Sequence, residues 1–329
     1  MRPDAEETSD RHAAGRNVRL KAAVLSGTGG IWRTLDEAGV TREVSMRGRL
    51  KQTGKASGEA LKLAVGDDVI IEQAERGDAW AIAEILPRRS RLARRAPGTE
   101  FRERVVVANV DQVLIVFAAA EPEPHPRMLD RFLVIAAAND IPARVVINKI
   151  DLASEADIRA RFATYERAGY PLHLTSAVTG AGLDALSAAL HARVTAISGP
   201  SGAGKSSLLN AVYPGFNLRV GEISRSVNKG RHTTVGASMH PLPDTEGGFA
   251  VDTPGLREVG IWELDPRELD ECFIEFRPHI EKCRFGDCLH RAEPGCAVRD
   301  AVAAGDVSAD RYDSYLRLLE ELERSARAW

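Results

Sequence analysis

The sequence predicts three folded domains: an N-terminal β-barrel, a central α/β domain and a mostly helical C-terminal domain that binds a metal. Short β-type runs separated by turn residues fill the first part of the chain, and a later apolar run leads through a glycine-rich loop into a helical pattern. All four cysteines lie in the last third of the chain. The expected divisions are a disordered arm at 1–17, the barrel at 18–92, the α/β domain at 103–262 and the metal-binding domain at 263–329.

The composition is that of a folded protein. Hydrophobic residues make up 44% of the 329 residues, which is enough for several cores. No apolar run approaches the roughly 18 residues of a membrane span, and residues 1–10 lack the apolar core of a signal peptide. We therefore expect a cytoplasmic protein without membrane contact. The net charge of −3 gives no sign of nucleic-acid binding by the whole chain, so any RNA contact must come from local patches.

The first domain is predicted from short β-type runs at 21–25, 42–46, 68–72 and 80–85. Glycines between the runs mark turns, and this spacing predicts a small five-stranded barrel. The OB-fold is the commonest five-stranded barrel fold that also binds RNA, so we expect an OB-like domain that contacts RNA. The barrel is followed by 87–95, which holds five arginines and is either a solvated linker or a contact for RNA phosphates.

The central domain alternates strands and helices. Apolar runs predict buried strands, and apolar residues three and four positions apart predict helices. The expected strands lie at 112–117, within 143–151, at 172–174 and at 248–251, and the expected helices lie at 128–138, 156–169 and 183–191. This alternation is typical of an α/β fold.

The apolar run at 196–198 opens the strongest motif, Gly-x-x-x-x-Gly-Lys-Ser, which passes directly into a helical pattern. Its glycines permit positive φ and bring backbone N–H groups against phosphates, where the helix N-terminus adds partial positive charge. Lys205 is expected to reach the β- and γ-phosphates of a nucleotide, and the Ser206 hydroxyl to bind Mg²⁺. The alternative is a glycine-rich turn that happens to contain a lysine. The predicted nucleotide-binding residues here are Gly199, Pro200, Ser201, Gly202, Ala203, Gly204, Lys205, Ser206 and Ser207.

A second motif, Asn-Lys-x-Asp, ends the β-branched run and comprises Asn148, Lys149, Ile150 and Asp151. The Lys149 stem can lie along a purine ring, and the Asp151 carboxylate can accept two N–H bonds from guanine, a donor pair that adenine lacks. Asn148 can bond the base and join this loop to the phosphate loop. Taken alone, the motif is also compatible with an ordinary loop between a strand and a helix.

Two later segments are predicted to face the terminal phosphate. Residues 224–234 are polar and basic, which indicates a functional loop rather than a simple connector. We favour Thr234 as the residue that binds Mg²⁺ through its hydroxyl and the γ-phosphate through its N–H, and the alternative is an ordinary surface loop. Asp252 at a strand end can hold Mg²⁺ through a water, and the Gly255 N–H can bind the γ-phosphate.

The C-terminal cysteines form a pattern typical of a structural zinc site. Three thiolates and one imidazole lie within 14 residues, and the predicted ligands are Cys283, Cys288, His290 and Cys296. Soft sulfur ligands with one histidine suit one tetrahedral Zn²⁺, and four ligands leave no open position for catalysis. The alternative is a set of unconnected cysteines. Cys272 falls outside the spacing and is expected to be a buried thiol, and residues 310–329 show the spacing of a helix with one packing face.

These elements resemble the nucleotide-binding loops of TRAFAC-type GTPases in a rotated order, because Asn-Lys-x-Asp precedes the phosphate loop here and follows it in Ras-like proteins. With the barrel before it and the Cys/His set after it, the chain resembles the ribosome small-subunit-dependent GTPase A (RsgA, also called YjeQ) family, whose GTPase domain is circularly permuted. The segments that carry this resemblance are 148–151, 199–207, 230–234, 252–256 and the Cys/His set. In guanine-nucleotide proteins a Ser-Ala turn offers N–H groups to guanine O6, which makes Ser176 and Ala177 candidates.

The resemblance implies a GTP hydrolase that acts in late maturation of the small (30S) ribosomal subunit. The subunit is expected to stimulate hydrolysis, and hydrolysis is expected to be coupled to release. Leu256 occupies the position of the water-orienting Gln of Ras, so His232 is the candidate substitute, although a solvated or phosphate-contacting role fits it equally well. Lys205 and Thr234 are the other candidate catalytic residues, because they can stabilise charge on the transferred phosphoryl group.

The implied cofactors are one structural Zn²⁺ and Mg²⁺ bound with GTP. The implied partners are the 30S subunit with its 16S rRNA, GTP and GDP, and other assembly factors, and the chain is expected to act as a monomer. One alternative is an RNA-binding assembly factor for which GTP is only a binding-state timer. Another is a P-loop ATPase or small-molecule kinase, which Asp151 disfavours because its carboxylate matches guanine.

Overall fold

The structure is a computed structural model, which describes residues 18–46, 63–74, 78–95, 103–216, 218, 237–243, 247–252 and 264–327. Three sequence predictions fall outside these residues: the arm at 1–17, the loop with His232 and Thr234, and the segment with Gly255. Within the described ranges, no helix is both long enough and apolar enough to cross a membrane.

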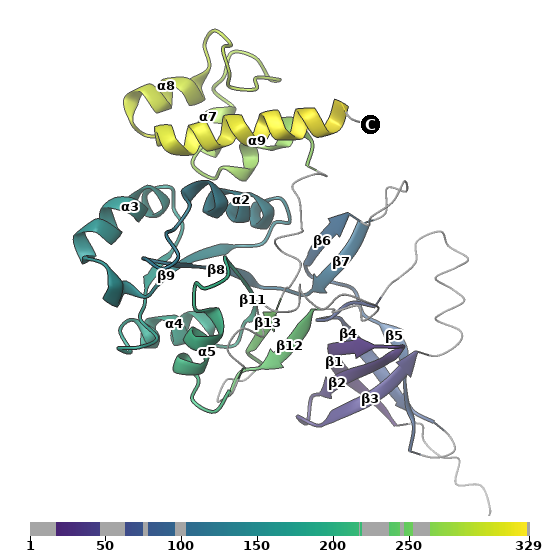
Figure 1. The fold of residues 1–329 in the computed structure, drawn as a ribbon. Coiled ribbons are helices and arrows are strands. Elements are labelled where there is room, and N and C mark those ends of the chain that lie inside the picture. The colour runs from purple at the N-terminus through teal and green to yellow at the C-terminus, as the bar shows by residue number, and fades with distance from the viewer. Residues whose placement is uncertain are drawn as a thin grey trace, which may run out of the picture.

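The first domain is a closed five-stranded barrel, as predicted (Figure 1). Its strands are β1 (Arg19–Thr28), β2 (Ile31–Asp36), β3 (Thr41–Met46), β4 (Asp68–Gln73) and β5 (Trp80–Ile85). Antiparallel pairing of β1 with β4 closes the barrel, and β3 pairs with β5 in parallel. Alternate residues face inward, so aliphatic side chains such as Val24, Val69 and Ile82 form the core.

Strand β2 is not among the β-type runs of the sequence because its inward face carries polar side chains. Asp36 is only 6% exposed and accepts bonds from Arg42 Nη2 (2.8 Å) and from the Val40 N–H (2.8 Å). Burial raises the pKa of this carboxyl, but the bonds from Val40 and Arg42 outweigh that effect and lower the pKa below its usual value. The Arg42 guanidinium also lies 4.5 Å from the Trp80 ring centroid. A paired charge therefore occupies part of the barrel interior.

The second half of the arginine-rich run after the barrel, residues 91–95, forms a strand and is not a simple linker. Strand β6 (Arg91–Arg95) pairs antiparallel with β7 (Glu103–Ala108). Just before β6, Arg88 donates to the fully buried Asp67 from Nε (2.6 Å) and from Nη2 (2.9 Å). Because a buried carboxylate needs a partner, this pair ties the run to the turn that opens β4.

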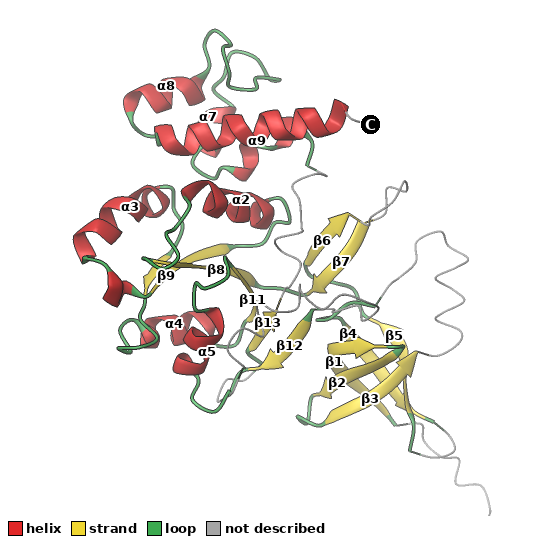
Figure 2. Ribbon diagram, in the orientation of Figure 1, coloured by secondary structure: helices red, strands yellow, loops and turns green. Residues whose placement is uncertain are grey.

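The central domain is a six-stranded sheet with helices on both faces (Figure 2). The strands are β8 (Gln112–Ala118), β9 (Ala143–Asn148), β10 (Leu172–Leu174), β11 (Val194–Ser198), β12 (Ser238–Pro241) and β13 (Phe249–Asp252), in the spatial order β10-β9-β8-β11-β13-β12. All neighbours pair in parallel except β12, which is antiparallel to β13. The expected strands 112–117, 172–174 and 248–251 agree with this structure to within one residue at each end.

The helices divide between the two faces of this sheet, and β8 shows why. Its Ile115 and Phe117 pack with α2 (Pro126–Ala137) and α3 (Glu155–Arg167), whereas Leu114 and Val116 pack with α4 (Leu183–Leu190) and α5 (Lys205–Val212). Successive side chains of a strand point to opposite faces, so a fully apolar strand such as β8 is buried on both sides. The three helices expected from helical spacing are confirmed to within two residues.

Residues 264–327 form a mostly helical C-terminal domain, as predicted. Its helices are η2 (Pro266–Glu268), η3 (Asp270–Cys272), α7 (Arg277–Ile280), α8 (Ala297–Ala304) and α9 (Ala309–Arg327). The stacked rings of Phe273 and Phe276 pack against Tyr315 of α9, and Cys272 is a buried thiol, as predicted. Helix α9 lies against α2 of the central domain (Figure 1).

Candidate functional site

Three predicted loops begin at the same edge of the central sheet. Strand β9 ends at Asn148, β11 ends at Ser198 and β13 ends at Asp252, and the register pairs Ala118 with Asn148 and Ile197 with Asp252. The chain passes outward from β8 to β9 and β10, and then returns to β11 on the other side of β8. The loop after β11 therefore starts where the strand order reverses, which is the usual ligand position in such a sheet.

The phosphate loop needs its glycines for two separate reasons. Gly199, Gly202 and Gly204 have φ of 136°, 80° and 85°, which L side chains rarely adopt. A Cβ at Gly199 would also lie 2.0 Å from the Val116 carbonyl oxygen, and one at Gly204 would lie 2.5 Å from Asn148 Nδ2. The loop backbone is thus pressed against β8 on one side and against the Asn148 loop on the other.

Lys205 begins helix α5 and its side chain bends back into the phosphate loop. Its Nζ donates to the carbonyl oxygens of Gly199 (3.0 Å) and Pro200 (2.8 Å), and the residue is 6% exposed. Ser206 beside it is also buried. The loop therefore encloses an ammonium group and a hydroxyl at a helix N-terminus, which is a suitable arrangement for binding phosphate.

Asn148 joins the loops of this edge to one another. Its Nδ2 donates to the Ala203 carbonyl (3.0 Å) in the phosphate loop, and its Oδ1 accepts the Ala177 N–H (3.3 Å) in the Ser-Ala turn. Lys149 has a positive φ of 60°, and its Nζ donates to the carbonyl oxygen of Glu121 in the segment between β8 and α2. No sequence pattern could indicate this role of Glu121, because its backbone and not its side chain makes the contact.

The carboxylate of Asp151 is held by a side chain that the sequence analysis treated only as a source of backbone N–H groups. Ser176 Oγ donates to Asp151 Oδ1 (2.5 Å) and accepts the N–H groups of Val178 (3.3 Å) and Thr179 (3.1 Å). Ser176 is fully buried, so these bonds orient its hydroxyl toward Asp151. The sequence predicted backbone N–H donors at the Ser-Ala pair, and the structure adds a bond from the Ser176 hydroxyl to Asp151.

The candidate residues at 148–151, 176–177 and 199–207, together with Asp252, all lie at this one sheet edge. These loops form one loop cluster, with the acidic side chain of Asp151 at one end and the basic side chain of Lys205 at the other end. This combination can bind a ligand that carries both hydrogen-bond donors and phosphates.

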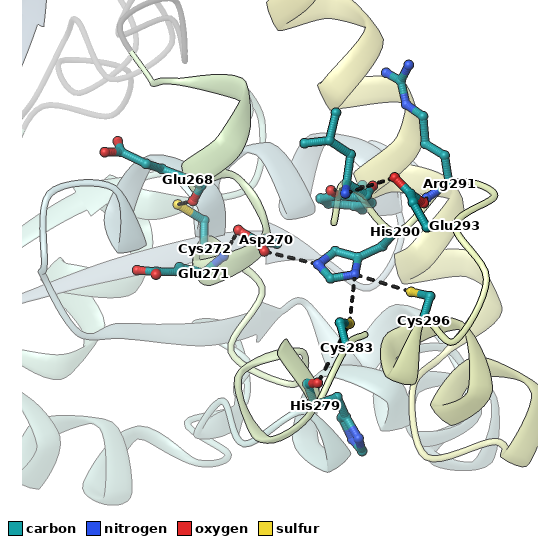
Figure 3. A network of polar contacts seen from close by, with 12 residues as sticks. Glu268, Asp270, Glu271, Cys272, His279, Cys283, His290, Arg291, Glu293 and Cys296 are labelled. Atoms are coloured by element: carbon teal, nitrogen blue, oxygen red, sulfur yellow. Dashed lines mark hydrogen bonds and ion pairs between the residues drawn. The ribbon is translucent and has the colours of Figure 1, made fainter. Parts of the chain in front are cut away.

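The predicted metal ligands meet in the C-terminal domain, and Figure 3 shows Cys283, His290 and Cys296 among them. The ligand atoms of Cys283, Cys288, His290 and Cys296 all lie within 4.8 Å of one another. His290 Nδ1 lies 3.3 Å from Cys296 Sγ and 3.6 Å from Cys283 Sγ. Tetrahedral zinc with ligands at about 2.0–2.3 Å would separate its ligand atoms by roughly 3.5–3.8 Å, so these residues fit such an ion.

Burial raises the pKa of the Cys288 thiol to about 12 and also raises the pKa of Cys296. A divalent cation between the sulfurs reverses this preference, because it stabilises the thiolates directly. The chemistry of the donor set therefore also suits a metal of the zinc class.

A carboxylate that the sequence analysis did not identify orients the histidine ligand. Asp270 Oδ2 lies 3.0 Å from His290 Nε2, on the side of the ring opposite the cysteines (Figure 3). Since Nε2 is taken by this bond, Nδ1 is left to face the sulfurs, which is a common arrangement at metal sites. The hydroxyl groups of Tyr312 and Tyr315 donate to the carbonyls of His290 (2.5 Å) and Leu289 (2.9 Å), so α9 also supports the loop.

Replacing Asp270 with Asn is expected to weaken metal binding by about 10- to 100-fold, because the neutral amide holds the imidazole less firmly. Titration of the metal-loaded protein with a competing chelator measures this change. Asp265→Asn is the matched control, since within the described residues the Asp265 carboxylate bonds to Arg267 and to none of the four predicted ligands. Equal metal affinity of the two variants would contradict the role of Asp270.

Comparison with known proteins identifies the family of this chain. A sequence model of the RsgA GTPase family matches residues 85–262. A protein of Gemmatimonas aurantiaca named small ribosomal subunit biogenesis GTPase RsgA is 59% identical over 300 residues, which cover 91% of this chain and 96% of that protein. A protein of the same name from Chromohalobacter salexigens is 44% identical over 79% of this chain and 75% of that protein.

Solved structures show the same architecture. The crystal structure of YjeQ from Thermotoga maritima is similar with a TM-score of 0.76 and 33% identity, and the match covers 93% of this chain and 99% of that chain. YloQ, described as a circularly permuted GTPase, is similar with a TM-score of 0.71 and 29% identity over 95% of this chain and 98% of that chain. With a family match over more than half its length and relatives that align with nearly all of it, the chain belongs to the RsgA GTPase family.

Proposed function

We propose that this protein hydrolyses GTP to GDP and phosphate in late maturation of the small ribosomal subunit. Its family is one of GTPases, and relatives that cover most of the chain are named for small ribosomal subunit biogenesis. The observation that best supports the proposal is the bond of 3.0 Å between Asn148 Nδ2 and the Ala203 carbonyl, because it joins a base-recognition motif to a phosphate-binding motif.

The base-binding end of the pocket is formed by 148–151 and the Ser-Ala turn. Asp151 accepts the N1 and N2 hydrogens of guanine, and Ser176 keeps its carboxylate in the required orientation. Lys149 covers one face of the ring. On binding, the N–H groups of Ser176 and Ala177 exchange their partners in the structure, the Ala181 carbonyl and Asn148 Oδ1, for guanine O6. Adenine offers Asp151 no such donor pair, so this end selects for guanine.

The phosphate end is formed by 199–207 and by Asp252. Backbone N–H groups of the loop and the N-terminus of α5 bind the phosphate oxygens. On binding, Lys205 exchanges the carbonyl oxygens of Gly199 and Pro200 for oxygens of the β- and γ-phosphates. Ser206, Thr234 and Asp252 are the residues that would hold Mg²⁺, which when bound neutralises charge on the β- and γ-phosphates. Gly255 donates its N–H to the γ-phosphate.

Hydrolysis breaks the bond between the γ-phosphorus and the bridging oxygen of the β-phosphate and forms a new bond from water to phosphorus. The phosphate loop and Lys205 stabilise the charge that develops on the bridging oxygen, so they contribute more in the transition state than in the ground state. Water must also be oriented, and Leu256 cannot do this. His232 takes that role in the proposal.

Replacing His232 with Ala is expected to abolish the stimulation of turnover by the small subunit while nucleotide affinity stays unchanged. Loss of a water-orienting group costs about 100-fold or more in rate. Turnover in the presence of 30S subunits and binding of a fluorescent GDP analogue separate the two effects. Stimulated turnover equal to that of the unchanged protein would remove His232 from the mechanism.

The proposed partners are the 30S subunit, through its 16S rRNA, and other assembly factors. The barrel, the arginine-rich run and the metal-binding domain bind the subunit, and hydrolysis is coupled to release. The C-terminal site holds one structural Zn²⁺. The protein acts as a monomer in the cytoplasm, where ribosomal subunits are assembled.

The experiment that tests this function is GTP turnover measured with purified 30S subunits, with 50S subunits and with neither. Turnover is expected to rise only with 30S subunits, and binding to them is expected to weaken steeply with salt, because phosphate contacts release counterions. Equal stimulation by both subunits, or by neither, would contradict the proposal. Equal competition by ATP would instead favour a general P-loop ATPase.

A further inference from the structure

A buried charge cluster joins the C-terminal domain to the GTPase domain. Arg311 of α9 is 1% exposed, and its Nη1 donates to Asp130 of α2 (2.7 Å), which is equally buried. Arg311 also donates to Glu275 through Nε (2.6 Å) and Nη2 (3.0 Å). Its guanidinium lies 4.6 Å from the centroid of the Phe273 ring. One arginine thus contacts a carboxylate from each domain.

The cluster is closed off from water on the GTPase side by two tyrosines. The rings of Tyr165 and Tyr170 each lie 5.6 Å from the Arg311 guanidinium, and both tyrosines are buried. Burial raises the pKa of Tyr170 to about 12, so its hydroxyl stays neutral. In this enclosed position, removing one charged partner leaves another charge buried without compensation.

Two more ion pairs cross the same contact between α2 and α9. Arg131 donates to Glu321 through both terminal nitrogens (2.8 and 2.9 Å), and Arg127 Nη2 donates to Asp313 (3.2 Å). The second pair is exposed to solvent and contributes little by itself. Together with the Arg311 cluster, the pairs define one position of α9 along α2, because a shift in either direction would separate charges.

The segment that leads into α2 contacts both nucleotide-binding loops. The Glu121 carbonyl accepts from Lys149 Nζ, and the Ala119 N–H donates to the Asn148 carbonyl (2.8 Å). A Cβ placed on Gly202 of the phosphate loop would lie 3.3 Å from Pro122. A shift of α2 would therefore move the segment that contacts the base loop (148–151) and the phosphate loop (199–207).

We infer that Arg311 is a positioning residue for the guanine-nucleotide site. By holding Asp130, it sets the position of α2, and through residues 119–125 it sets the spacing of the base loop and the phosphate loop. Nucleotide binding and docking of the C-terminal domain then stabilise each other, because energetic coupling between two sites is reciprocal. This inference rests on the proposed nucleotide-binding roles of Lys149 and the phosphate loop.

The test is the affinity of the full-length, metal-loaded protein for a fluorescent GDP analogue. Arg311→Met, which keeps side-chain length without charge, is expected to weaken binding by roughly 5-fold or more. Arg127→Ala is the matched control, because it removes an exposed pair across the same contact and is expected to change affinity less than 2-fold. Unchanged metal content in both variants shows that the Cys/His site is intact. An affinity within 2-fold of the unchanged protein in metal-loaded Arg311→Met would overturn the inference.

Two measurements keep the inference testable if Arg311→Met does not fold. The variant with Asp130→Leu, Glu275→Leu and Arg311→Met replaces all three charges by apolar groups, and such replacements are often well tolerated. It is expected to fold and to bind the GDP analogue more tightly than an Asp130→Asn single variant. In the unchanged protein, GDP is expected to slow hydrogen exchange in α9. Equal exchange of α9 with and without GDP would overturn the inference.

These outcomes also separate the inference from the proposed function. Failure of the unchanged protein to bind the GDP analogue would overturn both. Normal binding by the unchanged protein together with normal binding by metal-loaded Arg311→Met would overturn the positioning role alone. A merely stabilising role of Arg311 would lower the melting temperature but would leave the affinity of the folded protein unchanged.

Discussion

Asp151→Asn is expected to lower the affinity for GTP by about 10²- to 10⁴-fold. The carboxylate accepts two hydrogen bonds from guanine in the proposed pocket, and each bond to a charged group contributes about 1.5–3 kcal/mol. Xanthosine triphosphate is expected to gain affinity relative to GTP, because its base carries an oxygen where guanine carries the 2-amino group, and the asparagine amide can donate to that oxygen. Competition of both nucleotides against a fluorescent GDP analogue measures the change.

The control for this prediction is Asp184→Asn, the same chemical change at an exposed position in α4. Asp184 lies outside the loop cluster, so its variant should keep the original preference for GTP. Ser176→Ala extends the test, because it removes the bond that orients Asp151 and leaves the charge in place. If Asp151→Asn and Asp184→Asn have the same base preference, Asp151 does not read the base.

Removal of the metal is expected to unfold the loop between α7 and α8. Structural zinc contributes about 10–16 kcal/mol in small zinc-binding peptides, which is comparable with the whole stability of a domain. The helices on either side, α7 and α8, have only four and eight residues, so they cannot hold the loop by themselves. Hydrogen exchange before and after treatment with a strong chelator measures this unfolding.

Two cysteine variants separate metal loss from general damage to the domain. Cys288→Ser removes one ligand and is expected to lose the metal. Cys272→Ser changes another buried cysteine, whose Sγ donates to the Glu268 carbonyl (3.6 Å) and lies outside the group of four ligands, so this variant is expected to keep one metal ion per chain. Retention of full metal content by Cys288→Ser would argue against the four-ligand site.

The contiguous parts of both sites could be predicted because their chemistry is local. The phosphate loop lies within nine residues, and its glycine spacing, lysine and following helix are sufficient to indicate phosphate binding. The four metal ligands lie within 14 residues and have few other uses together. Most strands and helices of the central domain were also predictable, because a period of two or 3.6 in apolar residues reports directly on burial, although β12 was not among the expected strands.

Prediction failed where a polar residue is buried or bonds to a buried partner. Strand β2 was not predicted, because Thr34 and Asp36 face the barrel interior, where apolar residues are usual. The arginine run after the barrel suggested a solvated linker or an RNA contact, yet Arg88 bonds to the buried Asp67 and residues 91–95 form β6. A charge pattern alone does not tell a solvated arginine from one with a buried partner.

By itself the sequence determined the three-domain order, the two nucleotide motifs and the Cys/His group that could hold a metal. Only the tertiary structure decided which of these groups act together: Asn148 with Ala203, Asp270 with His290, and Asp130 with Arg311, pairs that lie 55, 20 and 181 residues apart. The physical reason is that motifs and periodicities express short-range geometry. Whether a buried charge or amide is satisfied depends on which elements pack against it, and that is the outcome of many weak contacts summed over the whole fold.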